Sequence, residues 1–167
     1  LLTYLEFVAL QQNATGLQSV MAAQSRVGLL DVRFGGGEPE EVGVRLVSSS
    51  YFATLGVPAS VGRTFDAPSE PAPGTTPYAV LSYEFWQRRF GGGADTIGQP
   101  FNIRGTVFTV LGIAPSSFFG ETVGERPDMW VPLSMQGVVL PGRDWLHDTP
   151  GSFEKVMWLH VFGRLGP

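Results

Sequence analysis

The chain contains no cysteine among its 167 residues. This absence excludes disulfide bonds, thiolate zinc sites and thiol nucleophiles. No stretch approaches 18 uninterrupted apolar residues, so we expect no membrane-spanning helix within the chain. An initiator methionine and a basic N-terminal region are also missing, so we expect no signal peptide. We expect both ends of the chain to lie within a longer protein.

Positive charge is scarce as well. The formal net charge is −4, and the eleven Lys and Arg residues are scattered along the sequence. Proteins that bind nucleic acids carry clustered basic residues, and so do proteins held at anionic membranes by a polybasic segment. The charge pattern therefore argues against both classes.

The composition is that of a folded domain. Hydrophobic residues make up 43% of the chain and aromatic residues 12%, while 22 glycines and 13 prolines indicate many turns. The length fits one domain, or one domain with a subdomain.

Hydrophobic periodicity predicts an α+β fold of antiparallel hairpins with short helices. Thr3 and Glu6 form a capping-box pattern, Ser82 is a candidate N-cap, and Gly91 to Gly93 end a helix. We expect the first helix to pack on the first hairpin, and the proline-rich residues 66–77 to form an internal boundary. We expect helices at 3–12, 51–55 and 83–90, and hairpins that pair 20–34 with 41–48 and 101–103 with 107–113. Single strands are expected at 78–81, 128–133 and 156–164, and the proline in 128–133 indicates an edge strand or a strand end. Residues 136–152 are expected to form a loop.

No motif in the sequence identifies a catalytic, cofactor or metal site. Phe34 to Gly37 and Phe90 to Gly93 are two FGGG runs without the lysine of a phosphate loop, so they are interpreted as turns. Asp144, His147 and Asp148 offer ligand atoms, but the prolines and glycines around them favour a surface loop over a metal site. His160 alternates with aromatic residues on a strand and is interpreted as structural.

The acidic and hydroxyl residues also have simpler interpretations. The clusters Glu38/Glu40/Glu41 and Glu121/Glu125/Asp128 are expected to lie on solvated faces, because nothing fixes two carboxylates across a cleft. Ser48 to Ser50 lack the nucleophile elbow, and one of these serines is expected to cap helix 51–55. The aromatic residues are expected to be core or subdomain-interface residues, with a ligand groove as the alternative: Tyr51, Phe52, Phe65, Phe85, Trp86 and Phe90.

Five blocks of the sequence, in this order and spacing, resemble a known domain. They are VSSSYFATLGVPASVGRTF (47–65), YAVLSYEFWQRRFGG (78–92), IGQPFNIRGTVFTVLGIAP (97–115), PDMWVPLSM (127–135) and WLHVFGRL (158–165). Together they resemble the MacB-like periplasmic core domain of ABC transporter permeases of the FtsX-like, MacB-type family. The resemblance covers nearly the whole chain and is strongest to permeases that lack a fused ATPase.

The resemblance implies a two-part architecture. It predicts a porter-like subdomain made of 1–64 and 153–167, truncated before its expected second helix and strand. It also predicts an inserted, sabre-like subdomain made of 65–152. Within the first subdomain, Tyr51, Phe52 and Leu55 are expected to be packed anchors at the junction. The loop 137–151 has no counterpart in the family.

The resemblance also implies a function. It places the domain between the first and second membrane helices, in the periplasm, as part of a cytoplasmic-membrane protein. The implied role is to transmit ATP-driven conformational change for export of a small molecule, a peptide or a lipid, without catalytic residues or cofactors. The implied partners are a cytoplasmic ATPase subunit, a periplasmic or outer-membrane protein, and a second copy of the full-length, membrane-embedded permease.

Two alternatives belong to other classes. A periplasmic ligand- or partner-binding module would show a deep apolar pocket lined by Trp86, Trp130 or Trp145. A small hydrolase would use Glu121 and Asp128.

Overall fold

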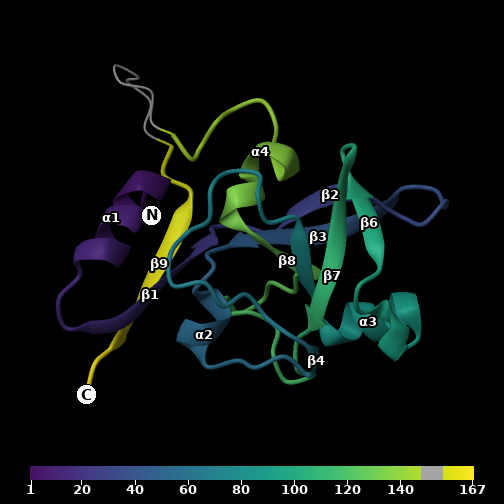
Figure 1. Ribbon diagram of the computed structural model, residues 1–167, viewed down its shortest axis with the longest axis horizontal. Helices are drawn as coiled ribbons and strands as arrows, with labels where there is room; N and C mark the ends of the chain where they lie inside the picture. The colour runs from purple at the N-terminus through teal and green to yellow at the C-terminus, as the bar shows by residue number, and fades with distance from the viewer. Residues whose placement is uncertain (148–155) are drawn as a thin grey trace.

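The structure, a computed structural model, describes residues 1–147 and 156–167 (Figure 1). It mixes strands with short helices, as the sequence predicts. None of the helices in the described ranges is both long enough and apolar enough to cross a bilayer. The elements are α1 (Tyr4–Asn13), β1 (Leu17–Gln24), β2 (Gly28–Phe34), β3 (Glu40–Val47), α2 (Tyr51–Leu55), β4 (Val61–Gly62), β5 (Tyr78–Leu81), α3 (Tyr83–Phe90), β6 (Pro100–Ile103), β7 (Thr106–Ile113), β8 (Met129–Pro132), α4 (Gln136–Val139) and β9 (Leu159–Leu165), with 3₁₀ turns at Ala94–Thr96 and Leu133–Met135.

Strands β2, β6, β7, β5, β8 and β3 pair in that order, and β3 pairs again with β2. These strands therefore close into a ring, which we call the strand ring. Val32 of β2 pairs with Glu40 on one edge and with Ile103 on the other, so β2 uses both edges. Two ladders of the strand ring, β3–β8 and β5–β7, are parallel, so the ring is not made of antiparallel hairpins alone.

Alternating apolar residues fill the inside of the strand ring, and α3 covers part of it. The helix begins where Ser82 Oγ accepts a hydrogen bond from the Phe85 N–H at 3.1 Å, and it ends at Gly91 in the left-handed conformation. Both caps confirm the sequence prediction. The buried side chains of this core include Val32, Phe34, Leu46, Leu81, Phe85, Ile103, Phe108 and Val131.

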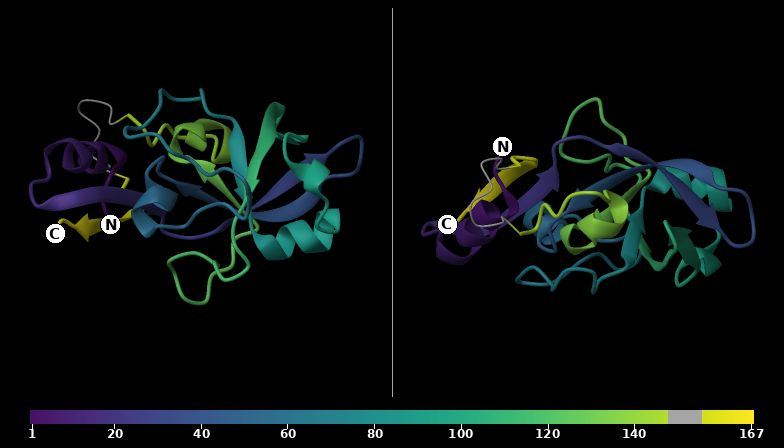
Figure 2. Two further views of the ribbon diagram at one scale, coloured as in Figure 1. Left: turned by 60° about the horizontal axis from the view of Figure 1, so that its bottom comes forward. Right: turned by 90° about the horizontal axis from the view of Figure 1, so that it is seen from above.

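The helix α1 and strands β1 and β9 form a second unit, which we call the α1 arm. β1 and β9 pair antiparallel from Leu17 opposite Leu165 to Gln24 opposite Leu159. The predicted capping box is present, since Thr3 and Glu6 each cap the other's backbone N–H. The expected packing of this helix on the first hairpin is confirmed in part, because α1 packs on β1, which contains residues 20–24 of that hairpin, and also on β9. Both chain ends lie in the arm (Figure 2).

The sheet does not separate at the predicted subdomain boundary between residues 64 and 65. Ladders β2–β6 and β3–β8 each join a strand from 1–64 to a strand from 65–152. The chain instead leaves the arm and enters the ring at the break between β1 and β2, at residues 25–27. The division into 1–64 with 153–167 and 65–152 remains a prediction.

The strand at 128–133 takes one of its two predicted forms, whereas the loop at 136–152 differs from its prediction. Strand β8 lies between β3 and β5, so the prolyl residue marks a strand end and not an edge, with Pro132 as the last residue. The expected loop 136–152 begins with the short helix α4. Its buried Gln136 donates to the carbonyls of Leu140 and Arg143 and accepts from the N–H of Trp145. Residues 148–152 of that loop lie outside the described residues.

Candidate functional site

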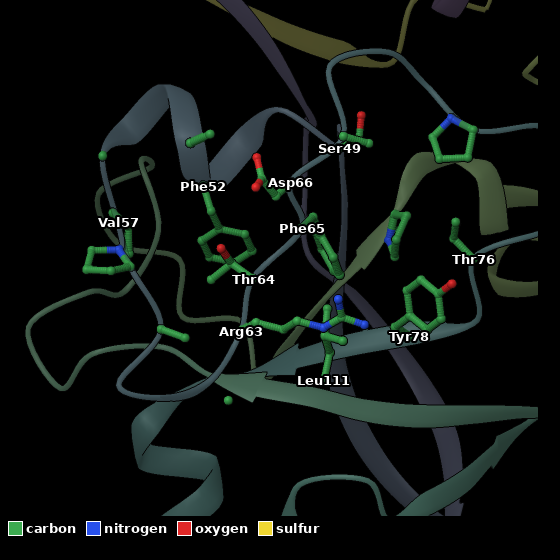
Figure 3. Close-up of a pocket in the computed structure, with 18 residues that line it drawn as sticks. Ser49, Phe52, Val57, Arg63, Thr64, Phe65, Asp66, Thr76, Tyr78 and Leu111 are labelled. Carbon is green, nitrogen blue, oxygen red and sulfur yellow. The ribbon is translucent and has the colours of Figure 1, made fainter.

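A cavity of about 990 Å³ lies beside α2 (Figure 3). We call it the α2 groove. It is bordered by α2 itself, by the chain from Gly56 to Ala67, and by residues of β5, β7 and β8. Its apolar lining includes Phe52, Val57, Phe65, Tyr78, Leu111 and Pro132.

Aromatic packing on the outside of the strand ring holds α2 in place. Phe52 packs against Trp130 and Phe65, with ring centroids 5.7 and 5.6 Å away. Tyr51 and Phe52 are fully buried, which confirms them as packed residues, while Leu55 is only half-buried. Gly56 then ends the helix in the left-handed conformation, which glycine adopts without strain.

The far wall of the groove depends on a close approach between two backbones. β4 pairs with the end of β7, where Gly62 lies opposite Gly112. A Cβ atom at Gly112 would overlap the backbone of Arg63, so only glycine fits. This contact fixes the start of the segment from Arg63 to Ala67, which runs along the groove.

The groove carries one charge of each sign at its exposed rim. Arg63 and Asp66 both line it, and neither side chain forms an ion pair or hydrogen bond with any described residue. An apolar floor with a few polar groups at the rim is the usual composition of a small-ligand site. Trp86, Trp130 and Trp145, the residues expected to line a pocket, do not line this one.

A buried ionic cluster lies on the other side of α2. The side chain of Arg45 on β3 is fully buried and approaches Glu121 at 2.9 Å and Glu125 at 3.3 Å. Its Nε donates to the carbonyl of Gln24 at 3.0 Å. The hydroxyl of Tyr51 donates to the carboxylate of Glu121. Burial and the negative charge of Glu121 raise the pKa of Tyr51.

The expected solvated face at Glu121, Glu125 and Asp128 is therefore wrong for Glu121, whose side chain is 6% exposed. Its ion pair with Arg45 offsets the cost of removing this side chain from water. Asp128 has different partners: it accepts from the N–H of Gly43 at 2.8 Å and from Arg88 at 3.0 Å. Glu121 and Asp128 thus have separate structural roles in ion pairs.

Arg45 is a buried site residue that the sequence pattern did not predict. In β3, Val42, Val44 and Leu46 occupy one face, and Arg45 falls on the opposite face, which the alternation assigns to solvent. In the structure both faces of β3 are covered from Val42 to Val47. The acidic segment that contains Glu121 and Glu125 could have indicated that an arginine is buried, since a buried arginine needs carboxylate partners.

The three serines before α2 each bind a different group. Ser50 occupies the N-cap position as expected, but its hydroxyl donates to the carbonyl of Val20 at 2.7 Å and makes no cap bond. Ser48 Oγ accepts from the N–H of Ala22. Ser49 donates through its N–H and hydroxyl to Glu70, at 2.9 and 2.8 Å, and burial raises the pKa of that carboxyl.

The remaining candidates lie apart from both features. The two FGGG runs form the β2–β3 turn and the end of α3, as expected. Asp144 and His147 contact each other at 2.8 Å on the surface, and Asp148 lies outside the described residues. His160 is half-buried on β9 near Phe162, and Glu40 pairs with Arg89. Among residues 1–147 and 156–167, no three His, Asp or Glu side chains gather as metal ligands would.

The strand ring and the α1 arm define a class of protein, an α+β domain whose fold is shared by the solved periplasmic region of MacB. The sequence places the chain within that class: residues 2–156 match the MacB-like periplasmic core domain, and the chain belongs to this family. The resemblance noted from five sequence blocks is thereby confirmed.

Solved structures share the fold at low sequence identity. The periplasmic region of MacB from Actinobacillus actinomycetemcomitans aligns with a TM-score of 0.68 and 13% identity, over 99% of this chain and 65% of that one. A domain from Porphyromonas gingivalis, whose parent protein is assigned as a permease, gives 0.62 and 14%, over 95% and 60%. The extracellular domain of the ABC-type transporter YknZ from Gram-positive bacteria gives 0.59 and 17%, over 84% and 68%.

The chain thus spans less than two thirds of the first two of these structures. No curated protein matches its sequence.

Proposed function

We propose that this chain is a non-catalytic, extracytoplasmic domain of an ABC transporter permease, located in the periplasm. Its role is to transmit conformational change, driven by a cytoplasmic ATPase subunit, across the membrane during export of a small molecule, a peptide or a lipid. The full-length permease would be membrane-embedded and dimeric, and would meet a periplasmic or outer-membrane partner. The match to the MacB-like periplasmic core domain over residues 2–156 carries this proposal.

The two parts of the architecture, the strand ring and the α1 arm, support a transmitting role. The strand ring is closed by hydrogen bonds, so it resists internal deformation. The chain passes from the α1 arm into the ring at residues 25–27. Strand β1 also bonds to the end of β3 and to the serines before α2, where Ala23 lies opposite Val47 and the N–H of Ala22 donates to Ser48 Oγ. We infer that the arm and the ring are the parts that move against each other, and that the chain crosses between them at 25–27. Rigid parts linked at such a point can rotate as bodies.

Location can be tested by cysteine labelling of the full-length permease, since this chain contributes no cysteine of its own. A Val123→Cys variant places a thiol at a fully exposed position. We expect a membrane-impermeant maleimide to label it in spheroplasts. Val42→Cys, at a fully buried position, is the matched control and should react only after unfolding. Labelling of Val123→Cys only after lysis would place the domain in the cytoplasm and refute the proposal.

Coupling can be tested at the junction between arm and ring. Gln11 of α1 is half-buried and its side chain contacts Ser50 at 3.4 Å. We expect the labelling rate of Gln11→Cys to change several-fold when the partner ATPase hydrolyses ATP, and not with an ATPase variant that cannot. Equal rates in both states, in a permease that still exports, would exclude movement at this junction.

A further inference from the structure

We propose that the α2 groove binds a short apolar peptide with free ends, which adds as an antiparallel strand to residues Arg63 to Ala67. This site is independent of the coupling role, and holds whether or not the domain transmits motion. Backbone pairing, apolar burial and charge at the two ends of the groove each contribute to the argument.

The first step concerns the backbone of this segment. All five residues from Arg63 to Ala67 line the groove. Successive side chains of an extended segment point to opposite faces, and Figure 3 shows Arg63 and Phe65 on one side and Thr64 and Asp66 on the other. Five consecutive lining residues therefore mean that the edge of the backbone itself borders the groove.

That edge has unused hydrogen-bonding groups. The N–H and C=O groups from Thr64 to Ala67 bond to no group among the described residues. Immediately before them, the N–H of Arg63 bonds to Leu111 as a continuation of the β4–β7 ladder. An unpaired edge beside an apolar cavity is the arrangement that receives an added peptide strand, where main-chain bonds give affinity and pockets receive alternate side chains.

The floor of the groove supplies the place for an apolar side chain. Phe65, Tyr78 and Leu111 line it, and its volume of about 990 Å³ lies at the upper end of the range for small-ligand sites, roughly 300–1,000 Å³. The five-residue segment spans about 13 Å at the rise of an extended chain. A peptide of about four residues matches that length.

The charges then set the direction of the peptide. Arg63 lies at the start of the segment and Asp66 near its end, and neither has a partner among the described residues. A peptide carboxylate beside Arg63 and a peptide amine beside Asp66 require the two chains to run in opposite directions. Blocking both ends of the peptide should therefore weaken binding.

The test titrates the 167-residue chain with the tetrapeptide Ala-Leu-Phe-Ala by NMR, following its backbone amides. We expect binding with a dissociation constant below a millimolar, and slower hydrogen exchange at the amides of Thr64 to Ala67. The N-acetylated, C-amidated peptide should bind at least fivefold more weakly. Decanoate serves as a second probe, because it offers an apolar chain and one anion but no backbone.

Two variants with matched controls locate the site. Ala53→Trp places a large side chain in the groove from an exposed position of α2 and should abolish binding, whereas Ala9→Trp on the exposed face of α1 should not. Arg63→Gln should weaken the free peptide about fivefold and leave the blocked peptide unchanged, with Arg26→Gln as the control.

Several results would overturn the proposal: no binding of the free peptide at 5 mM, tighter binding of decanoate than of the peptide, binding that survives Ala53→Trp, or unprotected Thr64 to Ala67 amides in the bound state.

Discussion

Arg45 and Glu121 form an ion pair at 2.9 Å in which both side chains are almost entirely removed from water. The pair joins β3 to the segment between β7 and β8, and that segment has no regular secondary structure to hold it. Because a buried charge is strongly destabilising without its partner, each residue requires the other.

Removing one partner should destabilise the domain far more than removing both. Arg45→Met should lower the free energy of unfolding by about 3–5 kcal/mol, because it leaves the buried carboxylate of Glu121 without its cation. Glu121→Met should cost less, because Arg45 keeps its ion pair with Glu125. The double variant should lose much less than the sum, as measured by urea denaturation. Arg126→Met, which removes an exposed pair with Glu84, should cost at most about 1 kcal/mol. Additive losses at Arg45 and Glu121 would show that the two residues do not interact.

Tyr51 should contribute through both its ring and its hydroxyl. Tyr51→Ala should lower the free energy of unfolding by about 3–5 kcal/mol, because it leaves a cavity in the cluster under α2. Tyr51→Phe should cost about 1–3 kcal/mol, because the hydroxyl bonds to the charged Glu121. Thermal or urea unfolding measures both. Tyr83→Phe is the control, since that hydroxyl bonds to no described residue, and a loss as large as that of Tyr51→Phe would contradict the assignment.

Local signals in the sequence predicted local structure well. Thr3 with Glu6, Ser82, and the glycines after Phe90 specify helix ends through bonds within a few residues, and these ends were found where expected. The hairpin of β6 and β7 was likewise found, because alternation and a turn at Arg104 and Gly105 define it.

Long-range pairing was not predictable in the same way. Nothing in the sequence of β2 indicates that its second edge pairs with β6, some seventy residues later, yet this ladder closes the ring. The burial of Arg45 likewise depends on distant residues, Glu121 and Glu125. The walls of the α2 groove come from residues as far apart as Ser49 and Pro132. A single sequence carries no record of such contacts.

Gly112 should tolerate no side chain. Gly112→Ala should destabilise the domain by more than about 2 kcal/mol, since its Cβ would meet backbone atoms of Arg63, which cannot move aside as a side chain can. Circular dichroism melting measures the loss. Gly137→Ala, where a Cβ meets nothing within 4 Å, is the control. An unchanged melting temperature for Gly112→Ala would mean that β4 is not held against β7.

Glu70 should make stability depend on pH. Burial raises its pKa in the folded state above the ordinary value of 4.5. Between 4.5 and that raised value the folded state binds more protons than the unfolded state, so this contribution to stability falls as the pH rises through that window. Denaturation midpoints across that window measure the slope.

A Glu70→Gln variant should remove that slope and be the more stable protein at neutral pH. Its remaining oxygen can still accept both bonds from Ser49, because Glu70 receives both at Oε1. Glu38→Gln, at an exposed turn, should keep the wild-type slope. If Glu70→Gln shows the wild-type slope as well, another group is responsible.

The closure of the strand ring has a mechanical consequence. A strand in an open sheet can slide or peel from its free edge, but each ring strand is bonded on both sides, so displacing one would break two ladders at once. A torque applied to the α1 arm should therefore turn the ring as one body. The exposed loop at Val123, held to β3 by Arg45, would then sweep the same angle as the ring itself.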